Sequence, residues 1–495
     1  MAIGDMAGAA SVHPTGLYQR HRPEQSLLYQ IVAQHYPMFR DLMEAQCKEL
    51  PTYVQREFDD FLKCGRLEHG FLRVRCDSCH VEHLVAFSCK RRGFCPSCGA
   101  RRMTESAALL VDDVLPRQPI RQWVLSFPFQ LRYLFANRPA VMGQVLGIVY
   151  RVIATHLIKK AGLTHQNART GAVTLIQRFG SALNLNLHFH MLFLDGVYAD
   201  DPHKGLRFVR VKAPSHEELT ALVGTIARRV GRKLERQGLL ERDIENSYLS
   251  AEAADDDPMA QLQGHSITYR IAVGPQAGRK VFTVQTLPTS DNTNDDRVGK
   301  MGGFSLHAGV SAGADERDKL ERLCRYISRP AVAEKRLSLT SNGQIRYRLK
   351  TPYRDGTTHV VFDPLDFIAK LAALIPKPRV NLSRFHGVFA SNSKYRALIT
   401  PSRRGKGKKC DSANERLDQS PAERRASMTW AQRLKRVFNI DINTCRECGG
   451  SVRVIACIED PVVINKILDH LNEKGGASAA VILPEGRAPP SSLFC

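Results

Sequence analysis

The sequence predicts an α+β protein with an N-terminal helical and cysteine-rich module, a central domain of mixed strands and helices, and a small C-terminal module behind a basic linker. Three observations predict it. Six cysteines lie within residues 64–98, and the next one is Cys324. Short strand-like segments and long amphipathic segments follow one another over residues 121–376, as in α+β domains. Beyond residue 400 the chain is rich in Gly, Ser, Pro and charge, with few apolar side chains to bury.

Composition and charge narrow the function classes. A chain of 495 residues with 43% apolar residues is neither wholly disordered nor fibrous. Lys and Arg number 71 against 49 Asp and Glu, a net charge of +22. This excess favours nucleic acid as the partner, ahead of an anionic membrane, with a merely basic enzyme as the alternative. The longest apolar run, residues 140–150, is too short to span a bilayer, and the first residues lack a secretory pattern, which predicts a cytoplasmic protein.

The helices and strands of each part are predicted from the spacing of apolar residues and from residues that begin or end such elements. The N-terminal module, residues 20–116, contains helices predicted over residues 24–49 and 104–114. The central domain is predicted over residues 121–400, the linker over 401–436 and the C-terminal module over 437–495, with a helix near 462–471. In the central domain we predict strands at residues 123–129, 172–179, 183–194, 267–273, 280–287 and 303–310, and helices at 140–161, 215–238 and 315–328.

Paired cysteines predict structural zinc. Cys76 and Cys79 form one C-x-x-C knuckle, and Cys95 and Cys98 form another after fifteen intervening residues. Each knuckle delivers two thiolates from one tight turn, so we predict that these four cysteines hold one zinc ion. A closed four-thiolate site has no open position, which favours folding and nucleic-acid docking over catalysis.

Other ligand-type residues leave further metal sites open. A second zinc ion could use the residues around the first pair of knuckles, namely Cys64, His69 and Cys89. Near the C-terminus, Cys445 and Cys448 form half of a zinc ribbon. Cys457 or His470 could complete it, although this spacing is not diagnostic.

The densest chemical signal is the segment Asn184-Leu-Asn-Leu-His188-Phe-His190-Met-Leu-Phe193. In a strand, alternate side chains point to opposite faces, so the two asparagines and two histidines share one face and the apolar residues share the other. His188 and His190 can each give a ring nitrogen to one divalent cation and leave positions open for a phosphate oxygen. The alternative is a pair of satisfied core histidines.

The helix predicted at residues 315–328 has an apolar stripe through Leu320, Cys324 and Ile327. At about 100° per residue, Tyr326 falls at the border of that stripe. Three arginines lie beside it and could contact DNA: Arg322, Arg325 and Arg329. Such a tyrosine could attack a phosphodiester whose charge the arginines offset, or it could simply be a rim aromatic.

These segments, in this order, resemble the rolling-circle transposases of the insertion-sequence ninety-one (IS91) family, in particular its common-region branch. The resemblance rests on the segments GRLEHGFLRVRCDSCH, SCKRRGFCPSC, LNLNLHFHMLFLDGVY, LERLCRYISRP and CRECGG. It implies a His-hydrophobic-His endonuclease domain, with an antiparallel sheet, helices on one face, a metal site on the sheet and a nucleophilic tyrosine on an adjacent helix. It also implies a bacterial protein that works at the nucleoid.

Carried onto this sequence, the resemblance makes His188 and His190 the expected ligands of a catalytic Mg²⁺ or Mn²⁺ and Tyr326 the expected nucleophile. His307 and Gln177 are candidates for a third ligand. The best-known members carry two tyrosines four residues apart, and here the earlier position is Arg322. A single-tyrosine version is therefore expected, in which strand release needs a second subunit, a free 3′-hydroxyl or another nucleophile.

The expected activity is transposition. The protein would nick one strand of single-stranded DNA at a mobile-element end, form a 5′-phosphotyrosine and pass the strand to a target, with structural Zn²⁺ elsewhere. Two rivals remain: a transposase that uses three carboxylates and two metal ions, and a non-catalytic zinc protein that binds nucleic acid. Of these three hypotheses, only the tyrosine mechanism predicts a covalent protein–DNA adduct.

Overall fold

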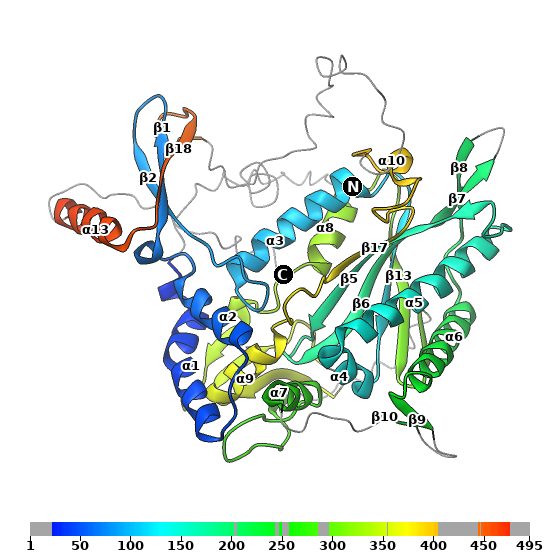
Figure 1. Cartoon of the computed structure of the whole chain (residues 1–495), viewed down its shortest axis with the longest axis horizontal. Coiled ribbons are helices and arrows are strands. Elements are labelled where there is room, and N and C mark those ends of the chain that lie inside the picture. Colours follow the sequence, from blue (N-terminus) through cyan, green and yellow to red (C-terminus); the bar gives the residue numbers. More distant parts are fainter. Residues whose placement is uncertain are drawn as a thin grey trace, which may run out of the picture.

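The computed structural model describes residues 22–201, 205–242, 247–249, 257–285, 297–353, 355–403, 444–445 and 447–475. The predicted basic linker lies almost entirely outside these residues. Helices and sheets are mixed throughout (Figure 1), and every strand pairing in the described parts is antiparallel. The protein is therefore a mixed helix and antiparallel-sheet structure.

A six-stranded antiparallel sheet forms the centre, with β6 as an inner strand. Its strands, in spatial order, are β12 (Val298–Met301), β13 (Phe304–Ala312), β3 (Ile120–Ser126), β6 (Leu185–Leu194), β5 (Gly171–Phe179) and β17 (Ser383–Gly387). The strand alternation predicted for β6 is correct, because the apolar side chains of one parity are fully buried on one face: Leu185, Leu187, Phe189, Met191 and Phe193. His188 and His190 consequently point to the opposite face.

Both faces of this sheet are covered by helices. The apolar face of β6 packs against α4 (Phe129–Asn137), α5 (Pro139–Lys160) and α6 (His216–Glu235). The face that carries the histidines packs against α3 (Pro96–Ala108), its π-helical continuation η3 (Leu109–Val114) and α8 (Arg317–Ile327). The expectation of helices on one face alone is therefore wrong. Apolar residues of the histidine face, such as Val173 and Leu192, need a cover as well.

A second core joins the N-terminal helices to a later part of the chain. The helices α1 (Leu27–Ala45) and α2 (Thr52–Lys63) share buried contacts with α9 (Pro364–Leu374) and a small sheet. The strands of that sheet, in spatial order, are β11 (Phe282–Gln285), β16 (Thr357–Phe362), β15 (Ile345–Arg348) and β14 (Leu337–Leu339). This core crosses the boundary predicted near residues 116–121.

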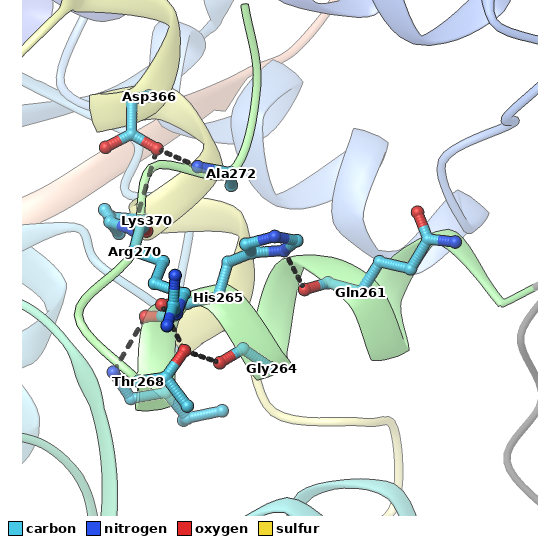
Figure 2. Close-up of polar contacts among 10 residues, drawn as sticks. Gln261, Gly264, His265, Thr268, Arg270, Ala272, Asp366 and Lys370 are labelled. Carbon is cyan, nitrogen blue, oxygen red and sulfur yellow. Dashed lines mark hydrogen bonds and ion pairs between the residues drawn. The ribbon is translucent and has the colours of Figure 1, made fainter. Parts of the chain in front are cut away.

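The segment 267–273, predicted as a strand, is instead a helix end and a loop. Helix α7 (Pro258–Ile267) begins at Asp257, whose side chain accepts from the Met259 amide. Figure 2 shows the other end of the helix, where the Thr268 hydroxyl donates to the Gly264 carbonyl at 2.8 Å. Tyr269 then has a φ of 57°, which breaks any extended run.

A buried ion pair on α9 holds this loop (Figure 2). Asp366 and Lys370 lie 3.6 Å apart and are almost completely buried. Lys370 Nζ donates to the Arg270 carbonyl, and the Ala272 amide donates to Asp366 Oδ1 at 2.7 Å. The conformation of this short apolar segment is thus fixed by Asp366, which is 94 residues away from Ala272 in the chain. Local periodicity cannot reveal such a contact.

The C-terminal segment pairs with the N-terminal module. Strand β18 (Val452–Ile458) lies beside β1 (Phe71–Cys76), which in turn pairs with β2 (Glu82–Ala86), and helix α13 (Pro461–Gly475) follows β18. Figure 1 shows these red and orange elements next to the blue hairpin. The predicted helix near residues 462–471 is present, but the segment that contains it lies against the hairpin of β1 and β2.

Helix α5 is the one described helix that is long and apolar enough to cross a membrane by length and composition. Most of it is buried against the central sheet, through residues such as Val145, Val149 and Ile153. Core helices of soluble proteins pass the same test, so this helix is weak evidence for a membrane span.

Candidate functional site

The first cysteine cluster consists of Cys64, Cys89, Cys95 and Cys98. Cys64 follows α2, and Cys95 caps the start of α3. The sulfur atoms of Cys64 and Cys98 are 3.7 Å apart, and those of Cys89 and Cys98 are 3.4 Å apart. A tetrahedral zinc ion with Zn–S bonds of about 2.3 Å places its sulfurs about 3.8 Å apart, so this cluster fits zinc.

The second cluster consists of Cys76, Cys79, Cys445 and Cys448. Cys76 Sγ lies 3.5 Å from Cys448 Sγ, and Cys79 Sγ lies 3.5 Å from Cys445 Sγ. The single site expected from the two N-terminal knuckles is therefore not the observed arrangement, since each knuckle belongs to a different cluster. The knuckles separate because β1 and β2 carry the first one away from α3, which begins at the second one.

Three candidate ligands from the sequence lie outside both clusters. His69 is exposed at the end of a 3-10 turn (Leu67–His69). Cys457 is exposed on β18, where its thiol contacts Glu459, and His470 is exposed on α13. Cys64 and Cys89 do join a cluster, but they do so with Cys95 and Cys98 rather than with His69.

The thiols of both clusters have strongly perturbed acidity. Hydrogen bonds from Cys64, Cys89 and Cys95 hold the pKa of the Cys98 thiol well below its usual range. A hydrogen bond from the Cys79 amide lowers the pKa of Cys76 to about 6. Hydrogen bonds from neighbouring thiols instead raise the pKa of Cys89 and Cys95, and the pKa of Cys79 is raised as well. Metal ions bind the thiolate form, so metal binding at either cluster would release protons.

The two histidines meet on the covered face of the central sheet. Their Nε2 atoms are 3.1 Å apart, and both side chains are buried. The Asn186 carbonyl accepts from His188 Nδ1 at 2.8 Å, so the proton is on Nδ1 and the Nε2 of His188 has a lone pair that can bind a metal ion. Two cis ligands about 2.1 Å from an octahedral cation lie about 3.0 Å apart, so the spacing fits a single divalent ion.

Burial keeps both imidazoles neutral. Desolvation lowers the pKa of His188 to about 4 and the pKa of His190 well below its usual value. The charge of Arg329 contributes in the same direction to both. In addition, the buried Oδ1 of Asn186 has no hydrogen-bond partner among the described residues, although it shares the histidine face. A buried polar site with neutral imidazoles and an amide oxygen without a described partner is suited to a cation.

Gln122 is a site residue that the sequence reasoning missed. Its side-chain nitrogen lies 2.6 Å from Nδ1 of His190, and it projects from β3 on the same face. Metal binding through His190 Nε2 requires the amide to accept from Nδ1–H, which the other amide orientation provides. The sequence shows only a weak signal, an amide at the start of the apolar stretch Gln122-Trp-Val-Leu, because the contact with His190 depends on strand register.

The two third-ligand candidates lie at different distances from the pair. Gln177 is directly opposite His188 on the neighbouring strand β5. His307 is opposite Val124, which is itself opposite His190, so it is two strands away, about 10 Å. Within the described ranges, no further His, Cys, Asp or Glu forms a metal-type cluster with the pair.

Helix α8 lies on the same face and presents Tyr326 at its C-terminal end. Leu320, Cys324 and Ile327 are buried as the apolar stripe requires, while Tyr326 is 41% exposed. The guanidinium of Arg329 lies 4.2 Å and the ammonium of Lys350 4.6 Å from the centre of the tyrosine ring. Two cations therefore flank the phenol.

Gln177 connects this helix to the histidine strand. Its side-chain nitrogen donates to the carbonyl of Ile327, the residue after Tyr326, at 3.2 Å. Next to this contact lies a cavity of about 300 Å³ between the start of α3, β5 and the ends of α8 and α9. Its described lining includes no acidic residue and five arginines: Arg91, Arg92, Arg102, Arg178 and Arg329. Arg91 forms an ion pair with Asp60, and the excess of positive charge along the rest of the lining favours anions such as phosphate.

Two family comparisons cover the parts of the chain that build these sites. Residues 31–127 match the family described as "Transposase zinc-binding domain", the zinc-binding domain of IS91 transposases. Residues 171–396 match the family described as "Putative transposase". The chain belongs to the IS91 family of transposases. No match was found among curated proteins or among solved structures.

The two matches cover different sites of this transposase. The first cysteine cluster lies wholly within residues 31–127, so the N-terminal part is a zinc-binding domain whose thiols are gathered. His188, His190 and Tyr326 all lie within residues 171–396. Cys445 and Cys448 lie beyond both matches. As a transposase, the protein acts on DNA.

Proposed function

We propose that the protein is a metal-dependent transposase that cuts one DNA strand at the end of a mobile element and transfers it through a 5′-phosphotyrosine, as in rolling-circle transposition. The observation that carries the proposal is one arrangement. A neutral histidine pair and a partly exposed tyrosine lie on the same face of one sheet, and Gln177 bridges their elements. This is the arrangement expected of a His-hydrophobic-His endonuclease.

In the proposed reaction the Tyr326 oxygen attacks the scissile phosphorus in line. A tyrosine–phosphorus bond forms, the bond from phosphorus to the 3′-oxygen breaks, and the phenol proton is balanced by the proton that the 3′-hydroxyl gains. Arg329 and Lys350 flank the phenol and offset the phosphate charge. His188 and His190 would hold Mg²⁺ or Mn²⁺, which supplies Lewis-acid stabilisation of the phosphate oxygens.

In this proposal one tyrosine takes part in both the cleavage step and the joining step. Helix α8 contains no second tyrosine, and the position four residues earlier is the exposed Arg322. The phosphotyrosine conserves the energy of the phosphodiester, so an incoming 3′-hydroxyl can reverse the first step and join a new strand. That hydroxyl would come from the target, from a second subunit's cleavage or from the nicked element itself.

Single-stranded DNA would approach along basic surfaces around the cavity. Five arginines line it, of which Arg91 is paired with Asp60, and Arg325 and Arg322 continue the charge along α8. These contacts would be to phosphates and would position the strand rather than read its sequence. A protein with this function would work in the cytoplasm, on DNA of the nucleoid.

The test is to trap and locate the covalent bond. The purified protein, dialysed free of added divalent metal, is mixed with single-stranded element-end DNA and Mn²⁺, then denatured and digested with nuclease and trypsin. We expect a nucleotide-modified peptide covering residues 326–335, which contains no tyrosine other than Tyr326. Cleavage without any adduct would favour a carboxylate transposase, and salt-sensitive binding without cleavage would favour a non-catalytic zinc protein. Either result overturns the proposal.

Gln122→Leu is expected to weaken Mn²⁺ binding about 10- to 100-fold, since groups that orient metal-bound histidines have effects of that size. The substitution removes the partner of His190 Nδ1 and leaves both ring Nε2 atoms in place. Strand cleavage is measured against Mn²⁺ concentration, with His188→Ala/His190→Ala as the inactive reference. Gln122→Glu, which can only accept, should restore much of the affinity. An unchanged Mn²⁺ dependence in Gln122→Leu would refute this positioning role.

A further inference from the structure

The second cysteine cluster joins residues that are 366 and 372 positions apart in the chain. Cys76 ends β1 and Cys79 lies in the turn before β2, whereas Cys445 and Cys448 precede β18. All four sulfurs lie within 4.8 Å of one another. The Sγ–Sγ distances between the two knuckles are 3.5 Å. They are far longer than a disulfide bond of about 2.05 Å and close to the spacing in a tetrahedral zinc thiolate.

The backbone around Cys445 and Cys448 is shaped as a zinc knuckle. The Cys445 amide donates to the Gly450 carbonyl at 2.7 Å, and Gly449 has a φ of 73°. A Cβ at Gly450 would lie 2.4 Å from Ser78 Oγ and 3.1 Å from Cys76 Sγ. The two glycines after Cys448 therefore allow the turn and the close approach to the first knuckle.

The strand pairing places the two knuckles in register. Cys76 is opposite Val452, Phe71 is opposite Ile458, and the Asp77 amide donates to the Ser451 carbonyl at 2.8 Å. The knuckle of β1 and the knuckle of β18 thus face each other at one end of the same antiparallel ladder. This geometry brings the four thiols of the two knuckles together.

Apolar packing alone holds the C-terminal segment weakly. In the small cluster between α13 and the hairpin, Ile464 is the one fully buried residue that the C-terminal segment contributes among those described. Several of its apolar side chains remain exposed: Val454, Ile455, Val462 and Val463. Segments of this size with so little core usually depend on a metal or a disulfide.

We propose that Cys76, Cys79, Cys445 and Cys448 bind a second structural zinc ion, which fastens the C-terminal segment to the N-terminal hairpin. The first zinc site lies within residues 64–98, whereas the second joins residues 76 and 79 to residues 445 and 448. Release of the second ion would free the C-terminal segment and leave the first cluster intact. This inference does not depend on the cleavage chemistry proposed above.

Zinc content of the full-length protein tests the site. After exhaustive dialysis, the wild type should retain two zinc ions per chain, measured by mass spectrometry of the metal, and Cys445→Ser/Cys448→Ser should retain one. Cys457→Ser is the matched control, since its thiol is exposed in the same segment and lies outside both clusters, and it should retain two. One ion in the wild type, or two in the double variant, would overturn the proposal.

A second measurement tests the fastening directly. A site-specific protease sequence is inserted between residues 404 and 443, and the cut protein is passed over a sizing column. In the wild-type background the fragment containing β18 and α13 should elute with the large fragment, and Cys445→Ser/Cys448→Ser should separate them. Co-elution that persists in the double variant would mean that strand pairing suffices and that no metal fastening exists.

Discussion

Replacing Tyr326 with phenylalanine is expected to abolish covalent attachment to DNA and to slow strand cleavage by a factor on the order of 10⁴ or more, as loss of a nucleophile does in other covalent enzymes. The change removes only a hydroxyl. The ring that Arg329 and Lys350 contact remains, and the side chain is 41% exposed, so the free energy of unfolding should change by less than about 0.5 kcal/mol.

The measurement is the rate of adduct formation and of strand cleavage, followed on denaturing gels with labelled element-end DNA. Tyr395→Phe is the matched control, because it makes the same change at a tyrosine whose hydroxyl donates to Asp200 at 2.7 Å, away from the histidine pair. The control should form adduct at the wild-type rate. An adduct that persists in Tyr326→Phe would assign the attack to another residue.

Cys95→Ser is expected to unfold the N-terminal part of the protein. Structural zinc contributes about 10–16 kcal/mol of apparent binding free energy in zinc-finger peptides, which exceeds the usual stability of a whole domain. Cys64, Cys95 and Cys98 are all buried. The ion would link the end of α2 to the start of α3 inside a core of aromatic rings, where the centroids of Phe58 and Phe94 are 4.8 Å apart.

The unfolding should spread beyond the zinc-binding domain. The core that contains this cluster also contains Val360, Phe362 and Phe367 from the central part of the chain. Far-ultraviolet circular dichroism should therefore show less helix and sheet signal in Cys95→Ser than in the wild type already at 25 °C, before thermal unfolding begins. Cys47→Ser, an exposed cysteine outside both clusters, should melt like the wild type. A wild-type melting curve for Cys95→Ser would rule out a stabilising metal in the first cluster.

The sequence patterns with a fixed local geometry led to correct predictions. The alternation in residues 183–194 placed Leu187 and Phe189 in the core and His188 on the other face. The stripe of the tyrosine helix placed Cys324 inside and Tyr326 at the border. Both results follow from the periodicities of single strands and helices, which do not depend on the rest of the molecule.

Partnerships across the chain could not be predicted in the same way. The spacing between Cys79 and Cys95 is compatible with one shared ion, but a knuckle cannot specify which other knuckle it meets. Cys76 and Cys79 found partners more than 360 residues later, through the pairing of β1 with β18. Gln122 was overlooked for the same reason, because its role depends on the register of β3 against β6.

The pairing of β1 with β18 has a consequence during synthesis of the protein. The hairpin of β1 and β2 is synthesised well before its third strand, β18. At about 5–20 residues per second, the 366 residues from Cys79 to Cys445 take about 20–70 s to translate. Throughout that time two thiols and one edge of the hairpin stay open. A chain that ends before residue 445 has neither the second pair of thiols nor the strand that covers this edge.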